Sequence, residues 1–346
     1  MAKEAFNPND TTTFIRNALE KQRKSKADFS SELKQAARLH ARARGCLNLV
    51  FRDCYAGRPV NVDPLKDMVS DIHHAMAESP NSLLLITNLQ IPQEHDACHS
   101  FNTAVLAMHL GQHLGVNRGE LMALGLGGIL HDLGKTRIPP LMLVKTAKLT
   151  DEERAVVRKH ADDGYAALRA TGQLTSNVLD IVRYHHERTD GNGYPLGLEG
   201  ASVPELARMV ALVDAYDSLT GGYGYRQPMT PTAALQLLHN DSGEEYGSEL
   251  VEELIRCLGI YPIGSLVTLN SGAHVMVIAS NPGARLKPKV LQVCDEEGKF
   301  EKPRPLFDLS RYSEEEISAK WGINELADPI DLDIDLPQIV VEETLH

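Results

Sequence analysis

The stretch "LGLGGILHDLGK", residues 124–135, constrains the fold more than any other part of the chain. Its apolar run predicts a buried helix, and Gly134 fits the left-handed residue that ends a helix. The run nevertheless finishes on His131 and Asp132, and burying ionisable groups without partners costs several kcal/mol. Metal ions would satisfy both side chains. Neighbours on a helix point about 100° apart, so the two can reach different sides of one site, and a carboxylate can bridge two ions.

Further candidate ligands recur along the chain at intervals of about one helix plus its connection. They are His99, His160, His185, His186 and Asp214. Such spacing can direct ligands from several helices into the core of a bundle. Taken singly, His99 and His160 are also explained as structural histidines, but together with His131 and Asp132 the set predicts a metal site. His109 and His113 are expected to be surface or packing residues.

The pattern along the chain predicts a mainly α protein in three parts. Residues 1–90 show helical periodicity interrupted at "YAGRPVN", and residues 91–258 read as a helical bundle. Within the bundle, Thr150 and Glu153 form a capping box that should start a helix running towards Arg169. Residues 259–346 contain short β-rich runs divided by glycine turns, which predicts a small antiparallel unit. The acidic residues 324–346 are expected to form an extended arm or a partly disordered tail.

Composition narrows the class of protein. The chain has 35 Lys and Arg against 47 Asp and Glu, a formal charge of −12, which disfavours nonspecific binding to nucleic acid polymers or anionic membranes. No apolar run reaches the roughly 18 residues of a membrane span, and the N-terminus lacks the pattern of a signal peptide, so we expect a cytoplasmic protein. The five scattered cysteines indicate neither disulfides nor a zinc ribbon.

Several motifs occur in order along residues 80–264. They are "HSFNTAVLAMHLGQHLG", "HDLGK", "KTAKLTDEERAVVRKHADDG", "HHERTDGNGYP" and "ARMVALVDAYDSLT". Together they resemble the HD-GYP branch of the HD superfamily of metal-dependent phosphohydrolases. The resemblance implies an HD-type helical bundle that hydrolyses cyclic dimeric GMP (cyclic di-GMP) through pGpG towards GMP. It also implies two or three divalent metal ions, commonly iron or manganese.

The resemblance also implies roles for individual residues. One ion would be bound by His99, His131, Asp132 and Asp214, and a second by Asp132, His160, His185 and His186. Asp132 would therefore bridge the two ions, and Lys135 would stabilise the charge of the transition state. The substrate would be contacted by Lys135, Arg188, Gly193, Tyr194, Pro195 and Arg226.

The chain departs from the family pattern at two places. Where many members have Asp-Arg-Pro-Tyr-Arg, residues 221–226 read "GGYGYR", so that Tyr223 stands at an arginine position; a tyrosine there could stack on a guanine instead. Four residues before the first ligand histidine, His99, many members have tyrosine and some three-metal members have glutamate. This chain has His95 there, which either binds a third ion or caps its helix, and Glu94 and Asp96 are neighbouring alternatives.

Two other functions are compatible with the sequence. One is a receptor that binds the cyclic dinucleotide without useful turnover and signals through the N-terminal helices. The other is an HD hydrolase of a different nucleotide, such as mixed cyclic GMP-AMP. The helical periodicity of residues 1–90 permits a homodimer, whichever function the protein has.

Overall fold

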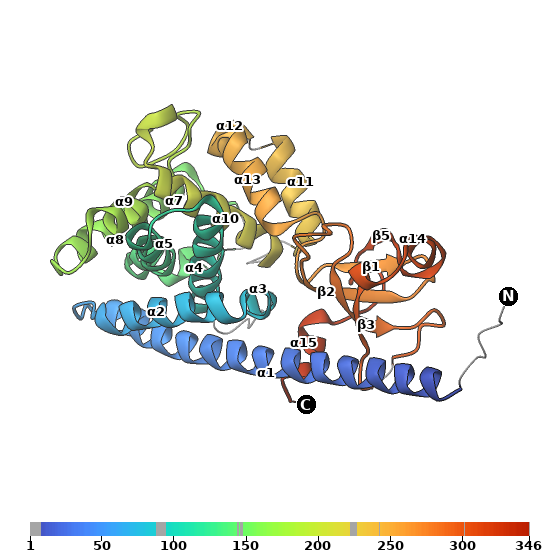
Figure 1. The fold of residues 1–346 in the computed structure, drawn as a ribbon. Coiled ribbons are helices and arrows are strands. Elements are labelled where there is room, and N and C mark those ends of the chain that lie inside the picture. Colours follow the sequence, from blue (N-terminus) through green and yellow to red (C-terminus); the bar gives the residue numbers. More distant parts are fainter. Residues whose placement is uncertain are drawn as a thin grey trace. The chain divides into compact units, whose positions relative to one another are not determined.

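The computed structural model describes residues 8–87, 95–143, 145, 148–221, 227–241, 243–300 and 302–345, and their side chains except those of 8–24 and 241. The chain is mainly helical, as expected, with a small antiparallel sheet towards its C-terminus (Figure 1). It packs as two compact units. One is formed by residues 36–265, the other by residues 1–35 and 266–346. The sequence predicts three parts, with boundaries at about residues 90 and 258. That these parts have separate roles stays a prediction.

The unit of residues 36–265 is a bundle of helices joined by short connections. Its elements are the C-terminal part of α1 (Pro8–Tyr55), α2 (Asp63–Glu78), α3 (Pro80–Thr87), α4 (His95–Leu114), α5 (Arg118–Leu130), the 3₁₀ turn η2 (Leu133–Arg137), α6 (Pro140–Leu143), α7 (Asp151–Arg158), α8 (His160–Arg169), α9 (Ser176–Tyr184), the 3₁₀ turn η3 (Gly200–Ser202), α10 (Glu205–Gly221), α11 (Pro231–Asp241), α12 (Gly243–Tyr246) and α13 (Ser248–Leu258). Among the described helices, none combines the length and the apolarity that crossing a bilayer requires.

Helices α4 and α5 form the centre of this bundle. Both are buried on nearly all sides, as an all-round apolar helix must be. The two backbones approach so closely that a Cβ at Gly128 would lie 2.7 Å from Ala104 Cα. The glycines of the apolar run therefore allow this contact, and the expected buried helix ending before His131 is confirmed.

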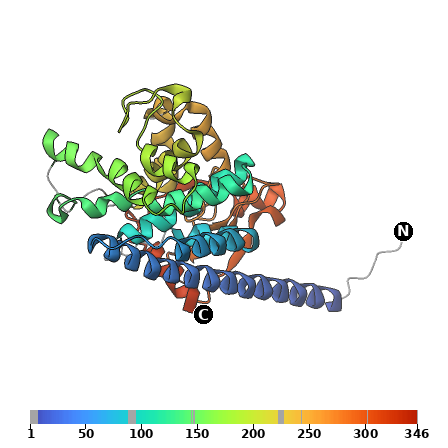
Figure 2. The same ribbon diagram turned by 90° about the vertical axis from the view of Figure 1, so that its left-hand side faces the viewer.

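The first two helices are separated where the sequence indicated. Helix α1 ends at Tyr55 and α2 begins at Asp63. Arg42 of α1 forms an ion pair with Asp71 of α2, and Figures 1 and 2 both show the two helices side by side. The apolar face of α2, which includes Leu65 and Ile72, is buried.

Two local expectations were wrong. The capping box of Thr150 and Glu153 is present, but the segment to Arg169 forms two helices, because the N–H of Lys159 bonds to the carbonyl of Val156 only three residues back and tightens the turn.

Gly134 does not adopt a left-handed conformation; it lies inside η2. A Cβ there would lie 2.7 Å from Gly164 N of α8, so the position requires glycine because of close packing.

The second unit contains the expected antiparallel sheet. Its strands are β1 (Leu266–Leu269), β2 (His274–Ala279), β3 (Lys289–Cys294), β4 (Leu306–Asp308) and β5 (Ile323–Ala327), in the order β4-β3-β2-β1-β5. Consecutive strands from β1 to β4 pair as a meander, with Leu266 opposite Met276 and Val290 opposite Phe307. The β1–β2 turn ends on Gly272 with φ 91°, a conformation that favours glycine.

The C-terminal residues form ordered elements, which corrects the expectation of an extended or partly disordered tail. Strand β5 pairs with β1, and helix α15 (Leu336–Leu345) follows it; between β4 and β5 lie η4 (Leu309–Arg311), α14 (Glu314–Glu316) and the π-helix η5 (Ile317–Trp321). Glu343 of α15 is buried and pairs with Lys26 and Arg304. Of the aliphatic residues in this segment, Ile339 and Val340 of α15 are buried, whereas Leu326 of the edge strand β5 is 44% exposed.

Candidate metal centre

Seven side chains from five separate segments converge inside the bundle. His99 lies on α4, His131 and Asp132 directly follow α5, His160 begins α8, His185 and His186 directly follow α9, and Asp214 lies on α10. Their ligand atoms form two groups, in each of which the atoms lie within 4.8 Å of one another. The first ligand group is His99, His131 and Asp214; the second ligand group is Asp132, His160, His185 and His186.

Asp132 lies between the two ligand groups and faces both of them. Its Oδ2 is 3.8 Å from Nε2 of His99 and 3.3 Å from Nε2 of His131. Its Oδ1 is 3.4 Å from Nε2 of His160 and 3.9 Å from Nε2 of His185. Each carboxylate oxygen is therefore directed to one group, which is the arrangement a bridging ligand of two cations needs.

The centre leaves buried polar atoms without partners. Among the described residues, neither Nε2 of His131 nor Oδ1 of Asp132 has a hydrogen-bond partner, although both atoms are buried. Buried polar groups are almost always paired, and an unpaired one costs about 1–3 kcal/mol. Imidazole and carboxylate donors suit divalent transition metals, so the residues present fit the metal ions that the fold implies.

The imidazole rings are oriented by hydrogen bonds on their outer nitrogens. Nδ1 of His131, His160 and His185 donates to the backbone carbonyl three residues earlier, at 2.8, 2.8 and 2.9 Å respectively. Each of these bonds places the proton on Nδ1 and turns the lone pair of Nε2 towards the centre.

His99 has a different outer partner, a buried carboxylate. Its Nδ1 lies 2.7 Å from Oδ2 of Asp217, whose Oδ1 accepts a hydrogen bond of 3.0 Å from Asn102. Its Nε2 lies 3.0 Å from Oδ1 of Asp214. A carboxylate behind a histidine raises the basicity of the ring and fixes its orientation.

The pKa of His99 and those of the histidines in the second group are shifted in opposite directions. Burial lowers the pKa of His160 and His185, and that of His186 to about 3, so the second group holds neutral imidazoles. Burial acts in the same direction on His99, but the hydrogen bonds to Asp214 and Asp217 raise its pKa to about 10. Burial opposes ionisation of Asp132 too, yet Lys135 and His131 hold its pKa well below the usual range.

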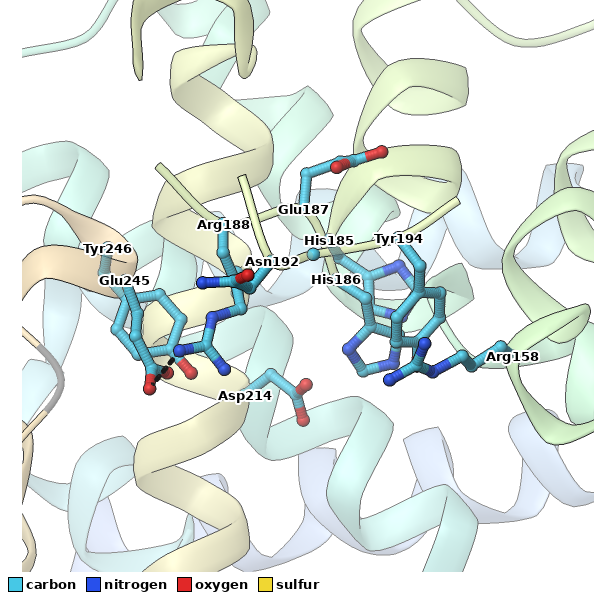
Figure 3. Close-up of a pocket in the computed structure, with 12 residues that line it drawn as sticks. Arg158, His185, His186, Glu187, Arg188, Asn192, Tyr194, Asp214, Glu245 and Tyr246 are labelled. Atoms are coloured by element: carbon cyan, nitrogen blue, oxygen red, sulfur yellow. Dashed lines mark ion pairs between the residues drawn. The ribbon is translucent and has the colours of Figure 1, made fainter. Parts of the chain in front are cut away.

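Of the predicted substrate residues, Arg188, Gly193 and Tyr194 line a pocket next to the ligand groups, whereas Lys135 and Pro195 are not part of its lining. Tyr194 stacks on His186 with ring centroids 4.6 Å apart, and a Cβ at Gly193 would lie 2.6 Å from Glu187 Cα, so the loop needs glycine there. Lys135 forms an ion pair with Asp132. Pro195 follows Tyr194 in the same loop. The pocket is lined by Arg158, His185, His186, Glu187, Arg188, Asn192, Gly193, Tyr194, Ala211, Asp214, Glu245 and Tyr246 (Figure 3).

Of the remaining predicted residues, the structure describes His95 and Arg188. His95 begins α4, is not part of either ligand group, and contacts Asp96 at 3.1 Å. Arg188 does line the pocket, but its guanidinium is engaged by two carboxylates, Asp190 at 3.0 Å and Glu245. Tyr223 and Arg226 lie outside the described residues.

Comparison with known proteins identifies the family of the chain. A family profile described as the HD domain matches residues 68–250, just over half of the chain. A curated relative, the cyclic di-GMP phosphodiesterase PA4108 of Pseudomonas aeruginosa, is 32% identical over 283 residues, which cover 82% of this chain and 68% of the relative. The chain belongs to the HD-GYP branch of the HD-domain family.

Two further similar proteins match different lengths of the chain. The cyclic di-GMP phosphodiesterase response regulator RpfG of Xanthomonas campestris pv. campestris is 35% identical over 148 residues, or 42% of this chain and 39% of RpfG. The structure of Bd1817, an HDG"Y"P protein from Bdellovibrio bacteriovorus, covers 72% of this chain and 80% of its own, with a TM-score of 0.55 and 21% identity. This second likeness concerns the fold.

Three residues of this HD-GYP centre were not predicted from the sequence. Asp217 supports His99, and its only signal was its place three residues after Asp214 on a buried helix. Glu187 is buried beside the paired histidines and accepts hydrogen bonds from the N–H groups of Leu196 and Leu198, at 2.6 and 2.8 Å. Arg158 lies two residues before His160 and lines the pocket.

Proposed function

We propose that this HD-GYP protein is a metal-dependent phosphodiesterase that hydrolyses cyclic di-GMP to pGpG, GMP or both. The observation that carries the proposal is Asp132, whose two oxygens face two groups of ligand atoms. The names of PA4108 and RpfG supply the substrate class. A pure receptor would have no need of all seven ligand positions.

The residues of each group would hold one ion, with Asp132 shared between them. Divalent ions bound there would act as Lewis acids towards phosphoryl oxygens and would acidify a water molecule. We place iron or manganese in the centre, although imidazole and carboxylate ligands suit several metals. His95 would take part only if a third ion is bound.

The protein's own side chains would orient the substrate and balance its charge. The Lys135 ammonium, one-third exposed and beside Asp132, would face negative charge that develops on the phosphate. Tyr194, stacked on His186, would form an apolar wall that keeps a bound phosphodiester in place and limits access of water. Glu187 would hold this loop in position through its two backbone hydrogen bonds.

A turnover assay tests the proposal. Protein purified anaerobically is analysed for metals, incubated with cyclic di-GMP, and the products are separated by chromatography; a chelator-treated sample is the matched control. We expect pGpG or GMP from the metal-containing sample only. Binding of cyclic di-GMP without any product would favour the receptor, and faster turnover of mixed cyclic GMP-AMP would identify another substrate.

Two further expectations belong with this function. We infer that the enzyme acts in the cytoplasm, where a nucleotide second messenger would be found, and that residues 1–90 support a homodimer. Light scattering of the purified chain tests the dimer, and fractionation of cells tests the location.

A further inference from the structure

Two arginines lie at opposite sides of the pocket beside the ligand groups. Figure 3 shows Arg188 next to Glu245 and Tyr246 on one side, Arg158 next to Tyr194 on the other, and Asp214 between them. The two guanidinium groups therefore face the same space from different elements, since Arg158 is the last residue of α7 and Arg188 belongs to the loop after α9.

The charge of Arg188 is already balanced by its neighbours. Its guanidinium pairs with Asp190 at 3.0 Å and with Glu245. The segment that carries Glu245 is held in place, because the N–H of Thr189 donates to the carbonyl of Glu245 at 2.8 Å. One arginine with two carboxylates has a net negative charge, so this side of the pocket offers an incoming phosphate little attraction.

Arg158 has no such partner. No carboxylate of the described residues forms an ion pair with it, and its guanidinium carbon lies 5.0 Å from the centroid of the Tyr194 ring. Stacking on tyrosine restricts the guanidinium without neutralising it. The side of the pocket near Tyr194 therefore presents an oriented positive charge.

We propose that Arg158 binds the second phosphate of the substrate, the one that is not being hydrolysed. The inference rests on the proposed function, because a cyclic dinucleotide carries two phosphodiesters and only one can occupy the ligand groups at a time. The other keeps its negative charge and needs a cation in the pocket. A guanidinium recognises phosphate with two parallel hydrogen bonds, and Arg158 is restricted by Tyr194 before the substrate arrives.

A purely structural role for Arg158 makes a different prediction. If the arginine only supported the ring of Tyr194, its removal would disturb the loop and impair every phosphodiester substrate alike. If it binds the second phosphate, its removal impairs a substrate with two phosphates and has little effect on a substrate with one. Bis(p-nitrophenyl) phosphate has one phosphodiester and no second phosphate, so it separates the two roles.

The test compares Arg158→Gln, Arg158→Lys and a matched control, Arg154→Gln. Arg154 lies on the same helix, pairs with Asp151, and does not line the pocket. For Arg158→Gln we expect KM for cyclic di-GMP to rise about 10- to 100-fold, the factor that loss of a charge-assisted hydrogen bond corresponds to. The change in kcat/KM for bis(p-nitrophenyl) phosphate should stay below about threefold. Arg158→Lys should be intermediate, and Arg154→Gln should match the wild type.

Four further measurements make the result decisive. Metal content and thermal unfolding verify that the variants are intact, and calorimetric titration measures the affinity for cyclic di-GMP independently of turnover. The wild-type KM should rise with ionic strength more steeply than that of Arg158→Gln, since one phosphate contact is missing in the variant. Equal losses on both substrates, or no loss of affinity for cyclic di-GMP, would overturn the inference.

The proposed function can fail separately from this inference. If the wild type binds cyclic di-GMP without hydrolysing it, the enzyme proposal fails, and the titration of Arg158→Gln still decides whether the arginine binds the nucleotide. If the wild type neither binds nor hydrolyses cyclic di-GMP, both proposals are wrong.

Discussion

The two ligand groups of the centre are supported in different ways. His160 and His185 of the second group bond to backbone carbonyls three residues earlier, which lie in the last turns of the preceding helices α7 and α9. His99 of the first group bonds to Asp217, 118 residues further along the chain, on another helix. The second group therefore depends on local helical geometry, whereas the first also depends on the packing of α4 against α10. A substitution on α10 that removes the support of His99 should therefore weaken the first group more than the second.

The largest expected effect comes from the residue that the two groups share. Asp132→Ala should remove most bound metal from both groups and lower kcat/KM for cyclic di-GMP more than about 1,000-fold, because the loss of a bridging ligand removes several kcal/mol of stabilisation. Elemental analysis and product separation measure the two effects. Asp163→Ala, on α8 and outside both groups, is the control. Normal turnover with unchanged metal content would show that the groups do not share this ligand.

The different support of the two ligand groups predicts a smaller effect for a substitution of Asp217, and this effect should be confined to the first group. Asp217→Asn keeps the shape of the side chain but removes the charge behind His99, so the affinity of the first group for metal should fall about 10- to 100-fold while the second keeps its ion. Metal titration should change from two tight sites to one tight and one weak site. Glu205→Gln, exposed on the same helix, serves as the control. Equal weakening of both sites would contradict the difference in support.

A third variant tests the loop beside the second group. Glu187→Gln replaces one of the two oxygens that accept the N–H groups of Leu196 and Leu198 by an amide that cannot accept. We expect a loss of about 1–3 kcal/mol in the free energy of unfolding and a rise of about tenfold in KM, with metal content retained. Urea unfolding and steady-state kinetics measure these quantities. Loss of metal together with the rise in KM would mean that Glu187 also supports His185 or His186.

The smallest effect is expected at a residue that touches neither group. Glu245→Gln removes one of the two negative charges next to Arg188, and KM for cyclic di-GMP should fall by about two- to threefold because less negative charge faces the phosphates. The metal content should not change. A higher KM would instead show that the carboxylate itself contacts the substrate, through the donor groups of a base.

Local patterns predicted most of the helices and the members of both ligand groups. The buried helix before His131, the capping box at Thr150 and the break after Tyr55 are each decided by residues a few positions apart. His131 and Asp132 stood out because ionisable groups follow an apolar helix. By contrast, the support of His99 by Asp217 and the neutralisation of Arg188 by Glu245 were not visible, since each joins residues on different elements.

The sequence by itself determined which residues can bind metal and that helices carry them, because helical periodicity, helix ends and side-chain chemistry are local properties. Only the tertiary structure decided which oxygen of Asp132 faces which histidines, why Gly134 must be glycine, and which of two arginines near the pocket keeps a free charge. These depend on contacts between elements that are distant in sequence, where a shift of a few ångströms changes every hydrogen bond and ion pair.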